Sequence, residues 1–220
     1  MWFVALAVAA PIPPAMIEYP SELLIPPVVF RMSDHQDIAP RLMKHLKSVQ
    51  QINSAYRVVF VGLHDALATQ SLKRCGAFDA YSKLVPKAFK SDMLRYCLLW
   101  LYGGFYMDLG SSLLRPFESA VRSDTEFVTA VDPGADGYAN GFIGAIPRHP
   151  ILRRAIDLCV KHVNSCFYGK RDLEVTGPML LKQVVQHDKI QILEAQYVNG
   201  TFIMMIGRGL IQNKYAEYNE

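Results

Sequence analysis

The sequence lacks the features that mark several common classes of protein. Its four cysteines, Cys75, Cys97, Cys159 and Cys166, form no C-x-x-C pair, which makes a zinc site unexpected and indicates reduced, partly buried thiols. It also has no G-x-x-x-x-G-K-[ST] segment of the kind that wraps phosphate groups. Any phosphate or metal chemistry must therefore come from other groups.

Long apolar runs and clusters of like charge are missing as well. The N-terminal apolar run ends at Ala10, ahead of three prolines, and is shorter than the roughly 20 residues of a membrane-spanning helix. The 23 Lys and Arg residues are scattered among 20 Asp and Glu residues, for a net charge of +3. This balance is too mild to indicate a nucleic-acid partner.

What is present is typical of one globular domain. The chain has 220 residues, of which 51% are hydrophobic and 20% charged, a composition that can bury a core and is not that of a disordered chain. Residues 1–24 are expected to form a poorly ordered leader or the stump of an anchor, through which membrane association without a full transmembrane helix can be envisaged. Residues 25–220 are expected to form the single domain.

Strand and helix patterns alternate along that domain. Residues 26–32 and 56–62 are short apolar runs that predict buried strands, and each is followed by a segment with helical spacing of apolar side chains, at residues 39–53 and 63–72. Such alternation predicts an α/β fold with a mostly parallel central sheet.

The segment AFKSDMLRYCLLWLYGGFYMDLGSS, residues 88–112, carries the most chemistry. Its apolar side chains at helical spacing are Leu94, Cys97, Leu98 and Leu101. Asp92 and Arg95 share a different face of that helix. The glycine pair at 103–104 is expected to end the helix, and Asp108 follows near the carboxyl end of a buried strand. Ligands of open α/β sheets bind at that end of the strands.

Each of these polar residues has an ordinary and a functional interpretation. Asp108 can be a turn or cap residue in a satisfied ion pair, or an oxygen ligand for a divalent cation. Asp92 and Arg95 can form a simple surface pair, or bind the hydroxyl and phosphate oxygens of a ligand. The residues alone leave both alternatives open.

The segment KAFKSDMLRYCLLWLYGGFYMDLG closely resembles the signature of the glycosyltransferase family 32, which carries a DXD sugar-binding motif. The positions that match are Ser91, Asp92, Arg95, Gly103, Gly104, Tyr106 and Asp108. Three other segments are similar to elements of the family in the same order: IPPVVFRMSD, INSAYRVVFVGLHDA and NGFIGAIPRHPILRRAI. With EVTGPMLL, the resemblance covers residues 25–181.

The resemblance implies a GT-A-type, Rossmann-like domain that binds a UDP- or GDP-sugar with Mn²⁺ or Mg²⁺. It implies a transferase that moves a hexose to a hydroxyl of a glycan, lipid or protein, with retention of configuration. In this implied site, Asp92 and Arg95 hold the donor sugar with Ser91 beside them. Tyr106 lines the donor pocket, and Asp108 contacts the ribose and the metal.

Three further residues enter the implied site with less support. Phe30, on the first predicted strand, either stacks on the nucleobase or belongs to the core. Asn140 is expected near the sugar or the acceptor. Thr176, in the TGP element, is expected there too, although that element can also be only the start of a helix. Asp132 and Asp136 are either acceptor-side acids or solvated loop residues.

One position departs from the family pattern. Gly110 stands where the second acid of the DXD motif is expected, so metal coordination would depend on Asp108, the diphosphate and water, with Ser111, Ser112 and Asp188 as further oxygen donors. The alternative function is a catalytically weak module that binds a nucleotide sugar or a glycan. A hydrolase or nucleotidyltransferase is a second alternative. The resemblance leaves the compartment open between a soluble or peripheral cytoplasmic protein and the Golgi lumen.

Overall fold

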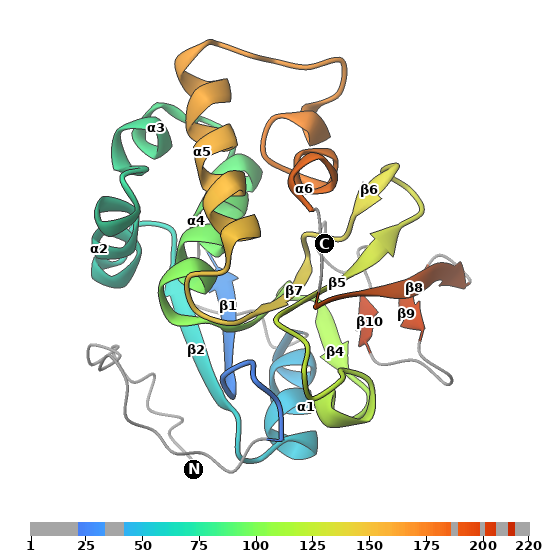
Figure 1. Cartoon of the computed structure of the whole chain (residues 1–220). Helices are drawn as coiled ribbons and strands as arrows, with labels where there is room; N and C mark the ends of the chain where they lie inside the picture. Colours follow the sequence, from blue (N-terminus) through green and yellow to red (C-terminus); the bar gives the residue numbers. More distant parts are fainter. Residues whose placement is uncertain (1–21, 34–41, 186–188, 199–200, 206–210, 214–220) are drawn as a thin grey trace.

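The chain is described by a computed structural model that covers residues 22–33, 42–185, 189–198, 201–205 and 211–213 (Figure 1). Residues 1–21 of the predicted leader, which is expected to span residues 1–24, and Asp188 lie outside the described residues. Within the described ranges, no helix is both long and apolar enough to cross a membrane.

A twisted sheet runs through the molecule, and helices cover both of its faces (Figure 1). The strands are β1 (Val28–Ser33), β2 (Arg57–Gly62), β3 (Gly104–Met107), β4 (Ser111–Leu113), β5 (Phe127–Asp132), β6 (Gly137–Tyr138), β7 (Phe142–Ala145), β8 (Ile190–Val198), β9 (Thr201–Met205) and β10 (Ile211–Asn213). The helices are α1 (Met43–Ile52), α2 (Ala66–Cys75), α3 (Phe78–Lys83), α4 (Lys87–Tyr102), α5 (Pro150–Asn164) and α6 (Pro178–Val184), with 3-10 turns η2 (Phe117–Ser119) and η3 (Asp172–Glu174).

The central part of the sheet has the order β2-β1-β3-β7-β5-β8. Strands β2, β1, β3, β5 and β8 run in one direction and only β7 opposes them, which confirms the mostly parallel α/β fold that the alternating pattern predicts. From β8 the sheet continues through antiparallel pairs to β9, β10 and β4.

Alternating side chains divide the core into two layers. Phe30 and Tyr106 pack with α2 to α6 on one face of the sheet. Phe105 and Met107 pack on the other face, with residues of α1 and the η2 turn. Asp108 follows β3 two residues after Tyr106, so the strand period directs it toward the face that α4 covers.

The predicted helix over residues 88–101 is α4, which is capped by Gly103 with a positive φ (66°) that favours glycine. A Cβ at Gly104 would lie 2.5 Å from the carbonyl oxygen of Val28. The second glycine therefore lets β3 start directly beside β1. The close approach fixes how α4 leads into the strand that ends at Asp108.

Candidate active site

Asp92 and Arg95 form a buried ion pair on α4. Arg95 Nη2 lies 3.1 Å from Asp92 Oδ1, and the two side chains are 6% and 12% exposed, in that order. The surface pair considered from the sequence is therefore wrong for this structure. Charges that are removed from water in this way need several polar partners, because desolvation is costly.

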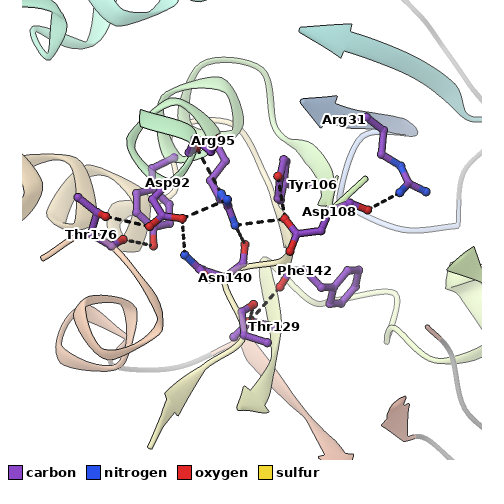
Figure 2. Close-up of polar contacts among 12 residues, drawn as sticks. Arg31, Asp92, Arg95, Tyr106, Asp108, Thr129, Asn140, Phe142 and Thr176 are labelled. Atoms are coloured by element: carbon purple, nitrogen blue, oxygen red, sulfur yellow. Dashed lines mark hydrogen bonds and ion pairs between the residues drawn. The ribbon is translucent and has the colours of Figure 1, made fainter. Parts of the chain in front are cut away.

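Asn140 and Thr176 supply those partners for Asp92 (Figure 2). Asn140 Nδ2 donates to Asp92 Oδ1 at 2.8 Å, and Thr176 Oγ1 donates to Asp92 Oδ2 at 2.8 Å. The hydroxyl of Tyr96 donates in turn to the Thr176 carbonyl at 2.9 Å. Asp92 thereby joins three segments that are far apart in sequence: α4, the approach to β7, and the loop before α6.

Arg95 connects this group to the end of β3. Its Nη1 donates to the Asn140 carbonyl at 2.6 Å and lies 3.6 Å from Asp108 Oδ1. Its guanidinium carbon lies 4.3 Å from the centre of the Tyr106 ring, a distance at which a cation is attracted to the ring face. Arg95 thus lies between the two acids.

Asp108 has one carboxylate oxygen that is held and one that is open. Oδ1 accepts a hydrogen bond from the Tyr106 hydroxyl at 2.9 Å, next to Arg95. In the described part of the chain, no residue donates a hydrogen bond to Oδ2. A Cβ at Gly141 would lie 2.4 Å from Oδ2, so this oxygen lies close against the glycine backbone, and the Asp108 side chain keeps 18% exposure.

Burial affects the pKa values of Asp92 and Arg95 differently. Burial raises the pKa of Asp92, although Arg95 and the hydrogen bond from Thr176 act in the opposite direction. Burial on its own would lower the pKa of Arg95, but Tyr106, Asp92 and Asp108 more than offset it and raise that pKa above its usual value. Arg95 therefore stays a cation between the acids.

Six of the eight predicted site residues are brought together: Asp92, Arg95, Tyr106, Asp108, Asn140 and Thr176 (Figure 2). Ser91 lies at the edge of the group, where its carbonyl accepts a hydrogen bond from Arg95 Nε at 3.3 Å. Phe30 is fully buried, and its ring centre lies 6.2 Å from that of Tyr102. The nucleobase role of Phe30 is thus not supported, and the core alternative describes it correctly.

Within the described residues, no hydrogen bond or ion pair joins the remaining predicted acids and hydroxyls to the Asp108 carboxylate. Asp136 is exposed and pairs with Lys182 at 2.6 Å, while Asp132 accepts from the Gly134 amide at 3.0 Å in a turn. The Ser111 hydroxyl is buried, and the Ser112 hydroxyl lies 2.6 Å from His45 Nδ1.

Two residues of the site have no counterpart among the sequence predictions. Gly141 lies against Asp108 Oδ2, where a side chain would collide with the carboxylate, and its carbonyl accepts from the Asp108 amide at 2.9 Å. Arg31, at 0% exposure on β1, donates to the Asp108 carbonyl at 2.6 Å. Only the register of β1 against β3 could have indicated Arg31, and sequence alone does not give that register.

The described residues supply only part of a coordination site for a divalent cation at Asp108. A partly exposed carboxylate oxygen that accepts no hydrogen bond from a described residue is a suitable ligand for Mg²⁺ or Mn²⁺, which often use one or two protein carboxylates together with substrate phosphates. Within the described ranges, however, no three His, Cys, Asp or Glu side chains are grouped to hold a metal. Among the described residues, Asp108 is thus the carboxylate that the site offers to an ion.

The fold and the site together define a class of protein. The solved structure of the PaToxG glycosyltransferase aligns with a TM-score of 0.61 and 18% identity over 73% of this chain and 68% of that chain, and the fold is the GT-A fold of glycosyltransferases. Residues 39–128 match the family described as "Glycosyltransferase sugar-binding region containing DXD motif". This match covers 90 of the 220 residues, and over that range the chain is similar to the family.

Two curated relatives support the assignment. A human alpha-1,4-N-acetylglucosaminyltransferase is 27% identical over 184 residues, which is 80% of this chain and 51% of the relative. Inositol phosphoceramide mannosyltransferase 1 of Schizosaccharomyces pombe is 30% identical over 119 residues, which is 50% of this chain and 37% of the relative. The chain therefore spans about half, or less, of the length of these relatives.

Proposed function

We propose that the protein transfers a hexose from a nucleoside-diphosphate sugar to a hydroxyl of a glycan, lipid or protein. The observation that carries this proposal is the Asp108 carboxylate at the end of β3. It is 18% exposed, lies 3.6 Å from Arg95 of the buried Asp92–Arg95 pair, and has an Oδ2 that accepts no hydrogen bond from a described residue. This is the edge of the sheet where α/β proteins bind ligands, and the similarity to the family gives the ligand class.

The donor sugar would lie between the two acids. A carboxylate has about four acceptor positions. In Asp92, three are occupied by Arg95, Asn140 and Thr176, which leaves about one for a sugar hydroxyl. Asp108 retains its Oδ2 for the ribose or the diphosphate. Asn140 and Thr176 would then act on the sugar mainly by fixing Asp92.

The leaving group is a nucleoside diphosphate, and its developing charge must be neutralised as the glycosidic bond breaks. A bound Mn²⁺ or Mg²⁺ supplies that neutralisation, and Asp108 is the residue that would hold it. Arg95 is already committed to Asp92, Asp108 and the Asn140 carbonyl. Its part would be to orient both acids and to oppose the effect of burial on the pKa of Asp92. Retention of configuration is proposed from the family alone.

The acceptor is proposed only as a hydroxyl. The names of the two relatives concern different sugars and different reactions, so they do not narrow the donor or acceptor of this chain. The loops around the site, which differ most between relatives of one fold, determine those choices.

The second candidate function is a module that binds a nucleotide sugar without turnover. The specific observation in its favour is Gly110, which leaves Asp108 as the single carboxylate of the motif. A weakly held metal would lower the rate of bond cleavage more than it lowers binding, because the charge to be neutralised develops in the transition state.

One experiment separates the two functions. UDP- and GDP-hexoses are titrated into the protein in a calorimeter, with and without Mn²⁺, and released nucleoside diphosphate is then measured with the same donors. Binding with metal-dependent release of the diphosphate supports the transferase. Binding without release, and without dependence on Mn²⁺, favours the binding module, and the absence of any binding contradicts both.

A further inference from the structure

Arg31 is a charged side chain that is completely enclosed by the protein. Arginine remains protonated under all ordinary conditions, and an enclosed charge is costly unless polar groups surround it. Since Arg31 has no exposed surface, it cannot touch a bound ligand. Its role must be sought in the groups that it holds.

Those groups belong to the turn that follows Asp108. Arg31 Nη1 donates to the Asp108 carbonyl at 2.6 Å and to the Ser111 carbonyl at 2.9 Å, and Nη2 donates to the His45 carbonyl at 3.2 Å. One guanidinium thus links both ends of the turn to α1. The turn carries the residue whose carboxylate is the open group of the site, and it contains Gly110, which has no side chain to anchor it.

The backbone of Asp108 is therefore held on both sides. Its amide donates to the Gly141 carbonyl at 2.9 Å, and its carbonyl accepts from Arg31. With the backbone fixed, the direction of the side chain is set by the bond from Tyr106 to Oδ1. Oδ2 then lies beside Gly141, on a side chain that is 18% exposed.

We propose that Arg31 is a positioning residue for Asp108: through the Asp108 and Ser111 carbonyls it holds the turn in the shape that presents Oδ2 to the donor. The expected effect on kcat/KM rests on the proposed transferase function, whereas the expected effect on the shape of the turn does not. A turn that lacks this anchor would sample other shapes, and displacement of a reacting group by about 1 Å can cost about 100-fold in rate.

The fold should survive loss of the side chain. The Asp108 carbonyl also accepts from the Ser111 amide at 2.9 Å, and the His45 carbonyl also accepts from the Ser48 hydroxyl at 2.6 Å. Two of the three carbonyls would keep a donor. An apolar side chain of similar length would in addition remove the cost of the enclosed charge, which can leave stability nearly unchanged.

The test compares Arg31→Met and Arg31→Lys with the wild type. The matched control is Arg153→Met, which removes an arginine that also holds a backbone carbonyl, that of Cys75 at 3.0 Å, outside the site. Amide hydrogen exchange at residues 108–113 is measured without ligand, together with the thermal midpoint. The value of kcat/KM for the best nucleotide-sugar donor is measured in parallel.

We expect Arg31→Met to exchange the amides of residues 108–113 at least about tenfold faster while the amides of α4 stay protected. We expect kcat/KM of Arg31→Met to fall about 10- to 100-fold. The value for Arg31→Lys should lie between those of the wild type and Arg31→Met, and Arg153→Met should match the wild type. Unchanged local exchange, or an increase spread evenly over the whole protein, would overturn the proposal. So would an unchanged kcat/KM in an active enzyme.

The two proposals fail in different ways. If the wild type releases no nucleoside diphosphate from any donor, the proposed function is refuted, while the exchange measurement still decides whether Arg31 holds the turn. If Arg31→Met does not fold, Arg31→Lys, which keeps the charge but loses the forked geometry, decides by the same two measurements.

Discussion

Asp92 and Asp108 flank the same arginine, but they are held very differently. Asp92 accepts from Arg95, Asn140 and Thr176, so that both of its oxygens are occupied. Asp108 is held at Oδ1 by Tyr106, while Oδ2 lies beside Gly141 and accepts no hydrogen bond from a described residue. Protein groups therefore bond both oxygens of Asp92 but only one oxygen of Asp108.

The difference shows how the site can be rigid and still accept a ligand. A carboxylate that accepts from three protein donors keeps three segments together, because removing any partner leaves a buried polar group without compensation. A carboxylate with an unused oxygen can bind without first breaking a contact. The first acid should therefore be more important for stability and the second for activity.

The largest effect is expected from Asp108→Asn. The amide preserves the size of the side chain and an oxygen for Tyr106 but removes the negative charge at the open position. We expect transfer to fall about 100-fold or more, as for the loss of one preorganised electrostatic group, with little change in stability. Released nucleoside diphosphate is measured, with Asp157→Asn on the exposed face of α5 as control. Equal rates for the wild type and Asp108→Asn would remove the distinction between the two acids.

Asp92→Asn should affect stability instead. Arg95, Asn140 and Thr176 all donate to the carboxylate of Asp92. The amide that replaces it has one acceptor oxygen and an NH₂ group that cannot accept, so at least one of these donors would lose its acceptor. Breaking a buried pair costs about 3–5 kcal/mol. Burial also raises the pKa of Asp92, so part of that cost is already present in the wild type, and we expect a loss of roughly 2 kcal/mol. Urea unfolding measures it, and an unchanged midpoint would contradict the supporting role.

A smaller effect is expected from Gly141→Ala. The added Cβ would lie 2.4 Å from Asp108 Oδ2, so the carboxylate must turn away and the space in front of it is filled. We expect about a tenfold loss of kcat/KM from this displacement. Gly76→Ala, at a left-handed position with no atom within 4 Å of the added Cβ, is the control for a glycine change that leaves the site intact. Full activity of Gly141→Ala would show that Oδ2 is not where the ligand binds.

Gly110→Asp should have the smallest effect and act on the metal. It restores the second acid of the motif close to Asp108, and affinity for a hard cation rises with the number of charged oxygen ligands. We expect the dissociation constant for Mn²⁺ to be about fivefold lower, which corresponds to about 1 kcal/mol of binding free energy. A Mn²⁺ titration followed by electron paramagnetic resonance measures it. Weaker or unchanged binding of Mn²⁺ would indicate that the ion is not held beside Asp108.

Much of this site could be predicted because it lies in one segment. Helical spacing placed Asp92 and Arg95 on one face of α4, and the glycine pair brought the strand that ends at Asp108 back beside that helix. Asn140 and Thr176 came only from the family resemblance, since no local pattern links residues 48 and 84 positions away from Asp92.

Other features depend on the tertiary structure and could not be predicted. In the sequence, Arg31 is a charged residue within an apolar strand. Its hydrogen-bond partners can be identified only from the packing of β1 against β3 and α1. The importance of Gly141 depends on what lies opposite its missing side chain. Phe30 was assigned two roles because an aromatic residue in a strand fits a core and a binding site equally well, and the covering helices place it in the core.

The most direct test of the account is the structure of the protein with a nucleoside-diphosphate sugar and Mn²⁺. The account predicts that the diphosphate oxygens or the ion lie beside Asp108 Oδ2, with metal–oxygen distances of about 2.0–2.6 Å, and that Asp92 keeps its bonds to Asn140 and Thr176. A donor bound elsewhere, or bound in place of Asn140 and Thr176 on Asp92 while Oδ2 stays free, would contradict it.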